Sequence, residues 1–293
     1  MDNKGLQKSQ IPQLALLTSG LIYAIYGPLT RITGNDFGEV TQSLIRAIMR
    51  VAIMIIVIIF VKDLKRIQKK DLPWFLLSGL AGAGSTLLYT YAIQKLSMGT
   101  TMFLFYGTGI IVSFIIGKIF YKEKLNKKKI ISLILSLAGL LLLFIKEIEF
   151  KNDWFIILAS LSGICYSVYS TFSKKISSNY SITQIVFSFA IIDIFAYAGS
   201  MIFITETSNF ASVTPWISSF IFALLVSLNV YLMIFGFKHL EAQKASLLLL
   251  SELIFIMIIG AVFYSEIPSI QEMFGSIFIF IGLALPNIKN EKK

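Results

Sequence analysis

Long apolar runs, separated by short polar segments, fill most of this chain. A helix needs about 20 mostly apolar residues to cross a bilayer. The runs are continuous rather than alternating over about ten residues, so they indicate helices and not the strands of a membrane barrel. The pattern predicts an all-α integral membrane protein with ten transmembrane helices, at 11–31, 39–61, 72–94, 98–120, 129–146, 153–173, 181–204, 215–237, 242–264 and 268–287.

Three blocks of sequence recur at a constant offset of 143 residues. Similar blocks at one spacing indicate an internal duplication, which decides the architecture before any single motif does. The matched blocks are GKIFYKE (117–123) with GAVFYSE (260–266), SGLIYAIY (19–26) with SGICYSVY (162–169), and Gly139 with Gly282.

The duplication divides the chain into two repeats of five helices, residues 1–148 and 149–293. Because five is odd, the second repeat must run through the bilayer in the opposite direction. We therefore expect Glu123 at the cytoplasmic face and Glu266 at the outer face. Inverted repeats of this kind are typical of secondary transporters, since two related halves can open a site to alternate sides.

Lys and Arg residues support this topology. With a cytoplasmic N-terminus, the basic clusters at 62–70 and 122–129 fall on the inside, as the positive-inside rule requires. The C-terminus is then also cytoplasmic, and the expected location is the cell membrane (plasma or inner). The outer side holds only Arg31, Lys95, Lys146 and Lys151.

Composition narrows the function classes. Hydrophobic residues make up 56% of the chain and charged residues 14%, whereas soluble domains carry roughly 25% charge. The net charge of +10 does not predict a nucleic-acid partner, because the basic residues lie between apolar runs and form no basic face with stacking aromatics. The single Cys165 and single His239 argue against a Cys/His metal cage or a Cys–His nucleophile. We expect no catalytic residues, no metal and no cofactor, and hence not an enzyme.

Several segments resemble the EamA-type permeases of the drug/metabolite transporter superfamily. YGPLTR (26–31) stands where that family often has an aromatic–Gly pair, YSVYSTFSKK (166–175) is similar to its sixth helix, and LLLLSELIFIMIIGAVFYSE (247–266) to its ninth. The resemblance covers about 11–287 and implies ten helices in two five-helix repeats.

Two positions depart from the family pattern. The family often has Pro in its fourth and ninth helices, where this chain has residues around Ile110 and Leu253. Without Pro, the carbonyl one turn back keeps its hydrogen bond. Local unwinding in the fourth helix would have to come from Gly107 and Gly109, and in the ninth helix nothing obvious supplies it.

Ionisable residues inside the predicted helices are candidates for a binding site, since each costs a few kcal/mol at the membrane centre without a partner or a wet cavity. Arg46 and Arg50 lie one turn apart on one helix face. Glu252 is the strongest candidate, because it could pair with an arginine, hold a proton or contact a cationic ligand. Asp193 fits a role in packing and a role in function equally well. The structural alternatives are snorkelling for Arg46 and a structural ion pair for Glu252.

Tyrosines at duplicated positions complete the candidate site. Tyr23 and its counterpart Tyr166 lie too deep for an interfacial belt. The predicted substrate-binding residues are Tyr23, Tyr26, Arg46, Arg50, Tyr89, Tyr106, Tyr166, Tyr169 and Glu252.

The mixed set of Arg, Glu and Tyr predicts a secondary transporter for a small polar or amphipathic metabolite, such as an amino acid or related compound. It would work by alternating access, with export as the expected direction and protons as a candidate coupling ion. The lipid bilayer and the substrate are the expected partners of a monomer or homodimer. The alternatives are a nucleotide-sugar or sugar-phosphate-type carrier, a cationic-compound carrier, or a non-transporting membrane scaffold.

Overall fold

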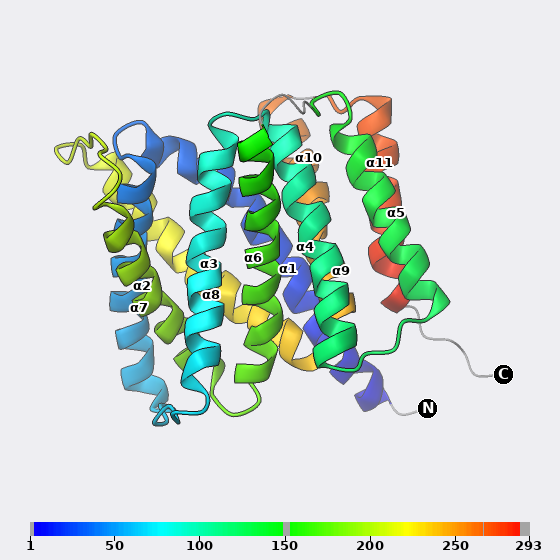
Figure 1. Cartoon of the computed structure of the whole chain (residues 1–293), viewed down its shortest axis with the longest axis horizontal. Helices are drawn as coiled ribbons and strands as arrows, with labels where there is room; N and C mark the ends of the chain where they lie inside the picture. The colour runs from blue at the N-terminus through cyan, green and yellow to red at the C-terminus, as the bar shows by residue number, and fades with distance from the viewer. Residues whose placement is uncertain (1–2, 149–152, 266, 288–293) are drawn as a thin grey trace.

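The structure is a computed structural model that describes residues 3–148, 153–265 and 267–287, and within these ranges all regular elements are helical. The helices stand side by side in one bundle (Figure 1). They are α1 (Asn3–Gly34), α2 (Glu39–Val61), α3 (Leu72–Ile93), α4 (Met98–Phe120), α5 (Lys127–Phe144), α6 (Asp153–Ile176), α7 (Ile182–Ser200), α8 (Thr214–His239), α9 (Ala242–Leu249), α10 (Ser251–Tyr264), α11 (Ile270–Ala284) and the 3₁₀ helix η1 (Leu285–Asn287).

The helix positions follow the apolar pattern closely, and the bounds of α2 and α4 are those predicted. Eight helical stretches in the described residues are long and apolar enough to cross a membrane, rather than the ten predicted. The two others are α1 and α5. Polar residues such as Gln13 and Ser19 lower the mean hydropathy of α1, and α5 begins with three lysines, so that its apolar part starts only at Ile130.

The predicted helix 242–264 contains an interruption for which its sequence offered no obvious cause. The stretch from Ala242 to Phe263 is divided at Leu250 into α9 and α10, whereas α4 continues through Gly107 and Gly109. At the break, the Leu250 N–H bonds the Leu247 carbonyl and the Leu253 N–H bonds the Leu250 carbonyl, so single tight turns replace the α-helical pattern. The interruption forms without Pro or Gly at that point.

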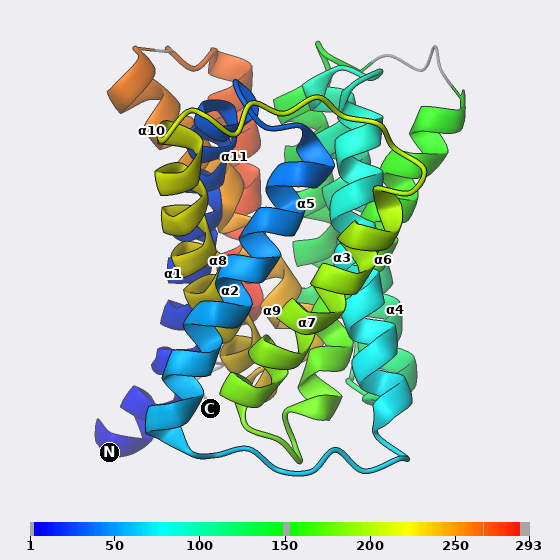
Figure 2. The same ribbon diagram turned by 90° about the vertical axis from the view of Figure 1, so that its left-hand side faces the viewer.

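Equivalent helices of the two repeats run in opposite directions. In Figure 1, α1 starts at the lower edge and rises, whereas α6 starts at the upper edge and descends. The start of α1 lies at this lower face (Figure 2), and α11 descends toward it (Figure 1). The connection between α4 and α5, which contains Glu123, also lies at the lower face (Figure 1). The predicted counterpart of Glu123, Glu266, lies outside the described residues.

Glycine contacts repeat with the 143-residue offset. A Cβ atom on Gly20 of α1 would collide with the Ser251 hydroxyl of α10, and one on Gly163 of α6 would collide with the Thr108 hydroxyl of α4. Gly163 is the counterpart of Gly20, and Thr108 is the counterpart of Ser251. The duplication therefore extends to individual side-chain contacts.

The interface of α5 with α11 contains two equivalent contacts, which are related by the same 143-residue offset. A Cβ atom on Gly139 would lie 2.7 Å from the Gly275 carbonyl oxygen, and one on Gly282 would lie 3.0 Å from the Ser132 carbonyl oxygen. Because 282 and 132 are the counterparts of 139 and 275, exchanging the two repeats maps this interface onto itself. The pseudo-two-fold axis therefore passes between α5 and α11.

Candidate functional site

A buried ion pair joins the two repeats where α2 packs against α7. The Arg50 Nη1 atom donates to the Asp193 Oδ2 atom over 2.6 Å, and each residue is only 7% exposed. Arg50 and Asp193 are themselves separated by 143 positions, so they occupy equivalent places in the two repeats. The pair therefore also lies at the pseudo-two-fold axis. Sequence reasoning did not assign this pairing, although the repeat offset alone could have suggested it.

Arg50 retains hydrogen-bonding capacity after this pairing. Among the residues that the structure describes, its Nε and Nη2 atoms have no hydrogen-bond partner, although both are buried. A guanidinium presents its donors in a planar fork that matches a carboxylate in a bidentate manner. The unpartnered edge of Arg50 can therefore take an anionic group while Asp193 holds the other edge.

Arg46 is more fully occupied. Its guanidinium carbon lies 3.7 Å from the centre of the Phe222 ring, and its Nη2 atom donates to the Gln42 side chain one turn away. Phe222 in turn packs on Tyr26 with ring centres 4.5 Å apart. Arg46 thus borders the tyrosine cluster through an aromatic ring, and its own polar contacts lie within α2.

The duplicated tyrosines contact one another. The Tyr23 ring centre lies 5.0 Å from that of Tyr26 and 6.3 Å from that of Tyr166, and Tyr166 is 6.4 Å from Tyr169. Phe105 extends this chain of rings. Its ring centre lies 5.2 Å from that of Tyr166, 5.3 Å from Tyr89 and 5.0 Å from Tyr106.

Glu252 lies at the other end of the chain of rings from Arg46. It stands in the first turn of α10, directly after the break at Leu250, and Tyr106 lies within hydrogen-bonding reach of its carboxyl group. The structure therefore connects eight of the nine predicted site residues in one cluster, drawn from α1, α2, α3, α4, α6 and α10. Arg50, the ninth, lies near enough to Tyr23 and Tyr169 of this cluster to interact with them electrostatically. The partner of Arg50 is Asp193 and not Glu252.

Asn229 fixes one side of this cluster. Its Nδ2 atom donates to the Tyr26 hydroxyl over 2.9 Å, and its side-chain oxygen accepts from the Ser19 hydroxyl. Both bonds join α8 to α1. Asn229 therefore makes an interhelix contact and holds Tyr26 in place.

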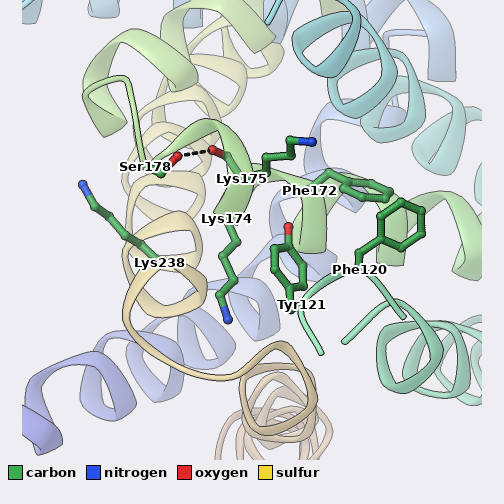
Figure 3. Close-up of a pocket in the computed structure, with 7 residues that line it drawn as sticks. All are labelled: Phe120, Tyr121, Phe172, Lys174, Lys175, Ser178 and Lys238. Atoms are coloured by element: carbon green, nitrogen blue, oxygen red, sulfur yellow. Dashed lines mark hydrogen bonds between the residues drawn. The ribbon is translucent and has the colours of Figure 1, made fainter. Parts of the chain in front are cut away.

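A surface pocket of about 560 Å³ lies apart from the buried cluster, where α4, α6 and α8 end at the lower face (Figure 3). The ammonium groups of Lys174, Lys175 and Lys238 point in different directions around it. Lys175 lies over the Trp74 ring at 3.6 Å. These lysines do not converge on a common point, so the buried cluster is the better candidate for a binding site. No group of His, Cys, Asp and Glu within the described ranges could hold a metal ion.

Comparison with solved structures supports the fold, and comparison with family models supports the relationship. One crystal structure matches with a TM-score of 0.81 and 16% sequence identity, covering 94% of this chain and 98% of the other. No curated protein matches. The model of the EamA-like transporter family matches twice, at residues 10–145 and 153–288. Each match covers one repeat, as the resemblance noted in the sequence predicted, and the protein is therefore a member of the EamA-like transporter family.

Proposed function

We propose that the protein is a secondary transporter that exports a small amphipathic metabolite, an amino acid or a related compound, by alternating access. The observation that carries this proposal is the state of Arg50. A buried guanidinium that Asp193 holds on one edge, and that has no partner on the other among the described residues, is costly unless a further acceptor, such as a substrate carboxylate, completes it.

The cluster offers complementary groups to the two ends of a zwitterion. The unpartnered edge of Arg50 would hold the carboxylate, and the Glu252 carboxyl would meet the amino group or carry a coupling proton. The tyrosine rings between them would contact the side chain of the substrate. Rings of this kind accept apolar and cationic groups alike, through packing and cation–π attraction.

The repeated contacts support alternating access. The Gly20–Ser251 and Gly163–Thr108 contacts are related by the repeat, so the two halves hold similar interfaces on opposite sides of the cluster. Two such interfaces can exchange roles as one half rocks against the other. The lysine-rich connections 62–71 and 121–126 lie at the lower face, which supports a cytoplasmic assignment for that face in the cell membrane.

A cationic-compound carrier is the second candidate. It is favoured by the position of Glu252, because Tyr106, Tyr89 and Phe105 gather beside a single carboxyl group. A nucleotide-sugar or sugar-phosphate-type carrier fits less well. Phosphate groups favour several free cationic donors, and of the two arginines in the cluster Arg46 is already engaged by Gln42 and Phe222.

Exchange in proteoliposomes tests the proposal. Vesicles loaded with one unlabelled amino acid at a time would be diluted into the same labelled compound, with tetraphenylphosphonium as a cationic comparison. We expect saturable exchange of at least one amino acid and strong loss of it in Arg50→Lys, since Lys cannot reproduce the planar fork. Exchange of the cation alone, lost in Glu252→Gln but not in Arg50→Lys, would favour the second candidate. Absence of exchange for the whole panel would contradict both.

A further inference from the structure

Charged side chains join the two halves at the lower face. Lys129, in the first turn of α5, is only 1% exposed although it carries an ammonium group. Its Nζ atom donates to Glu241 Oε1 over 3.1 Å, to Gln243 Oε1 over 2.7 Å and to the Lys124 carbonyl over 2.8 Å. Burial raises the pKa of Glu241, but the ammonium groups of Lys244 and Lys129 together lower it by more than burial raises it. The pKa of Glu241 therefore lies below its ordinary value. Glu241 is therefore ionised at neutral pH.

Glu123 makes a second connection from the first half to the second. Its carboxylate accepts hydrogen bonds from the backbone N–H groups of Ala242 at 2.7 Å and Gln243 at 3.2 Å. The Lys174 Nζ atom donates to it over 3.0 Å. A carboxylate at a helix N-terminus satisfies free N–H groups and interacts favourably with the helix dipole. Glu123 thus fastens the start of α9 to the connection between α4 and α5.

The upper face does not repeat the Lys129 contacts. The counterpart of Lys129 is Glu272, whose side chain closes a capping box with Ser269 inside its own helix. The counterpart of Glu241 is Met98, an apolar residue that is 47% exposed. The ionic bridge through Lys129 therefore belongs to one side of the molecule, although the helices that carry it are duplicated.

We propose that the contacts of Lys129 and Glu123 with α9 form an ionic gate, which closes the path from the lower face to the buried cluster. This inference rests on the proposed alternating access. When the gate opens, α9 separates from α4 and α5 and turns about the break at Leu250.

The position of α9 links this gate to the candidate site. Gln243 also donates to the Phe114 carbonyl of α4 over 3.3 Å, so α9 is tied to α4 as well as to α5. At its other end, α9 leads through Leu250 directly into Ser251 and Glu252. Movement of α9 therefore displaces the start of α10, where Glu252 meets the tyrosines. A ligand at Glu252 and the charges at the lower face act on the same short helix.

A thiol placed between the cluster and the lower face tests the gate. Ser170 lies on α6 one turn below Tyr166 and is 1% exposed. In a Cys165→Ser, Ser170→Cys background, reconstituted protein would be exposed to a membrane-impermeant methanethiosulfonate from the lower side. We expect Lys129→Met and Glu123→Gln each to raise the reaction rate about tenfold or more. Lys127→Met, which removes an exposed lysine two positions away, serves as the matched control and should leave the rate at the parental value.

A charge exchange separates gating from damage to the fold. Lys129→Glu combined with Glu241→Lys should bring the rate back toward the parental value, whereas unfolding would not be repaired by it. Unchanged rates in both Lys129→Met and Glu123→Gln, in protein with a normal unfolding transition, would overturn the proposal. If Lys129→Met does not fold, Glu241→Gln tests the same bridge from its more exposed partner. The assay uses no substrate, so a faster thiol reaction without transport in liposomes would contradict the proposed function and leave the gate supported.

Discussion

The contact between α1 and α10 and the contact between α6 and α4 are built on equivalent residues, yet they differ in what lies beside the glycine. Gly163 packs against Thr108, which donates to the Ser160 carbonyl over 2.9 Å in a continuous helix. Gly20 packs against Ser251, whose hydroxyl is buried and has no hydrogen-bond partner among the described residues. In the contact between α6 and α4, the hydroxyl beside the glycine is hydrogen-bonded. The contact between α1 and α10 lies at a helix break.

The next position differs in the same direction. Glu252 follows Ser251, whereas its counterpart Gly109 follows Thr108 and lies against the Gly163 carbonyl. A glycine allows two helices to approach closely, and a carboxyl group keeps them apart and needs polar surroundings. The duplicated scaffold is thus asymmetric at positions 109 and 252. The first repeat provides packing there, and the second provides a hinge and an ionisable group.

Breaking the ion pair on the pseudo-two-fold axis should have the largest effect on stability. At this place one repeat carries a buried positive charge and the other a buried negative charge. Asp193→Asn leaves the buried Arg50 without its counter-ion and should destabilise the protein by about 3–5 kcal/mol. Exchanging the charges, with Arg50→Asp and Asp193→Arg together, should recover much of this loss. Thermal unfolding in detergent measures both. A double variant no more stable than Arg50→Asp alone would contradict the pairing across the axis.

Alanine at the two equivalent glycines should sharpen the comparison at an intermediate level. Gly163→Ala should cost about 1–3 kcal/mol, because its Cβ meets the Phe105 backbone carbonyl, which cannot move independently of α4. Gly20→Ala should cost less, since the nearest atom is the hydroxyl of a serine side chain at a break. Gly84→Ala is the control, because nothing lies within 4 Å of its Cβ position. Equal losses at Gly20 and Gly163 would remove the distinction between the two contacts.

The smallest difference is expected at the two hydroxyls themselves. Thr108→Val removes hydrogen bonds to the Leu104 and Ser160 carbonyls and should cost about 1 kcal/mol. Ser251→Ala removes a buried hydroxyl that is unsatisfied among the described residues, so stability should stay the same or rise slightly. Chemical unfolding midpoints of the two variants would decide this. A larger loss in Ser251→Ala than in Thr108→Val would contradict it.

Much of the architecture could be predicted because membrane helices leave a strong signal. Apolar length predicted the ends of α2 and α4, and the repeat placed Tyr23 and Tyr166 at equivalent positions. The break at Leu250 could not be predicted, since the residues there are ordinary helix formers without Pro or Gly. Directly after the break, Ser251 and Glu252 lie against α1 at Gly20. Sequence patterns that describe one helix at a time do not contain such contacts.

Sequence patterns select candidate residues, but they do not pair them. The apolar runs place both Arg50 and Glu252 inside predicted membrane helices, and nothing in the runs says which acid meets which base. Asp193 and Glu252 lie at similar depths in their own helices, so both were possible partners of Arg50. In the structure Arg50 pairs with Asp193, its counterpart in the other repeat. The offset of 143 residues between the two is the sequence signal that points to this pairing.

The central claim is that the buried cluster binds a zwitterionic metabolite through Arg50 and Glu252. The most direct measurement is the melting temperature of the purified protein with each member of an amino-acid panel, for the parent, Arg50→Lys and Glu252→Gln. A ligand that binds only the folded state at about 100 times its Kd adds roughly 2.7 kcal/mol, which gives a clear rise in melting temperature. We expect this rise in melting temperature in the parent and its loss in both variants. Each variant should still unfold cooperatively without ligand. An equal rise in all three proteins would place the binding site elsewhere and contradict the account.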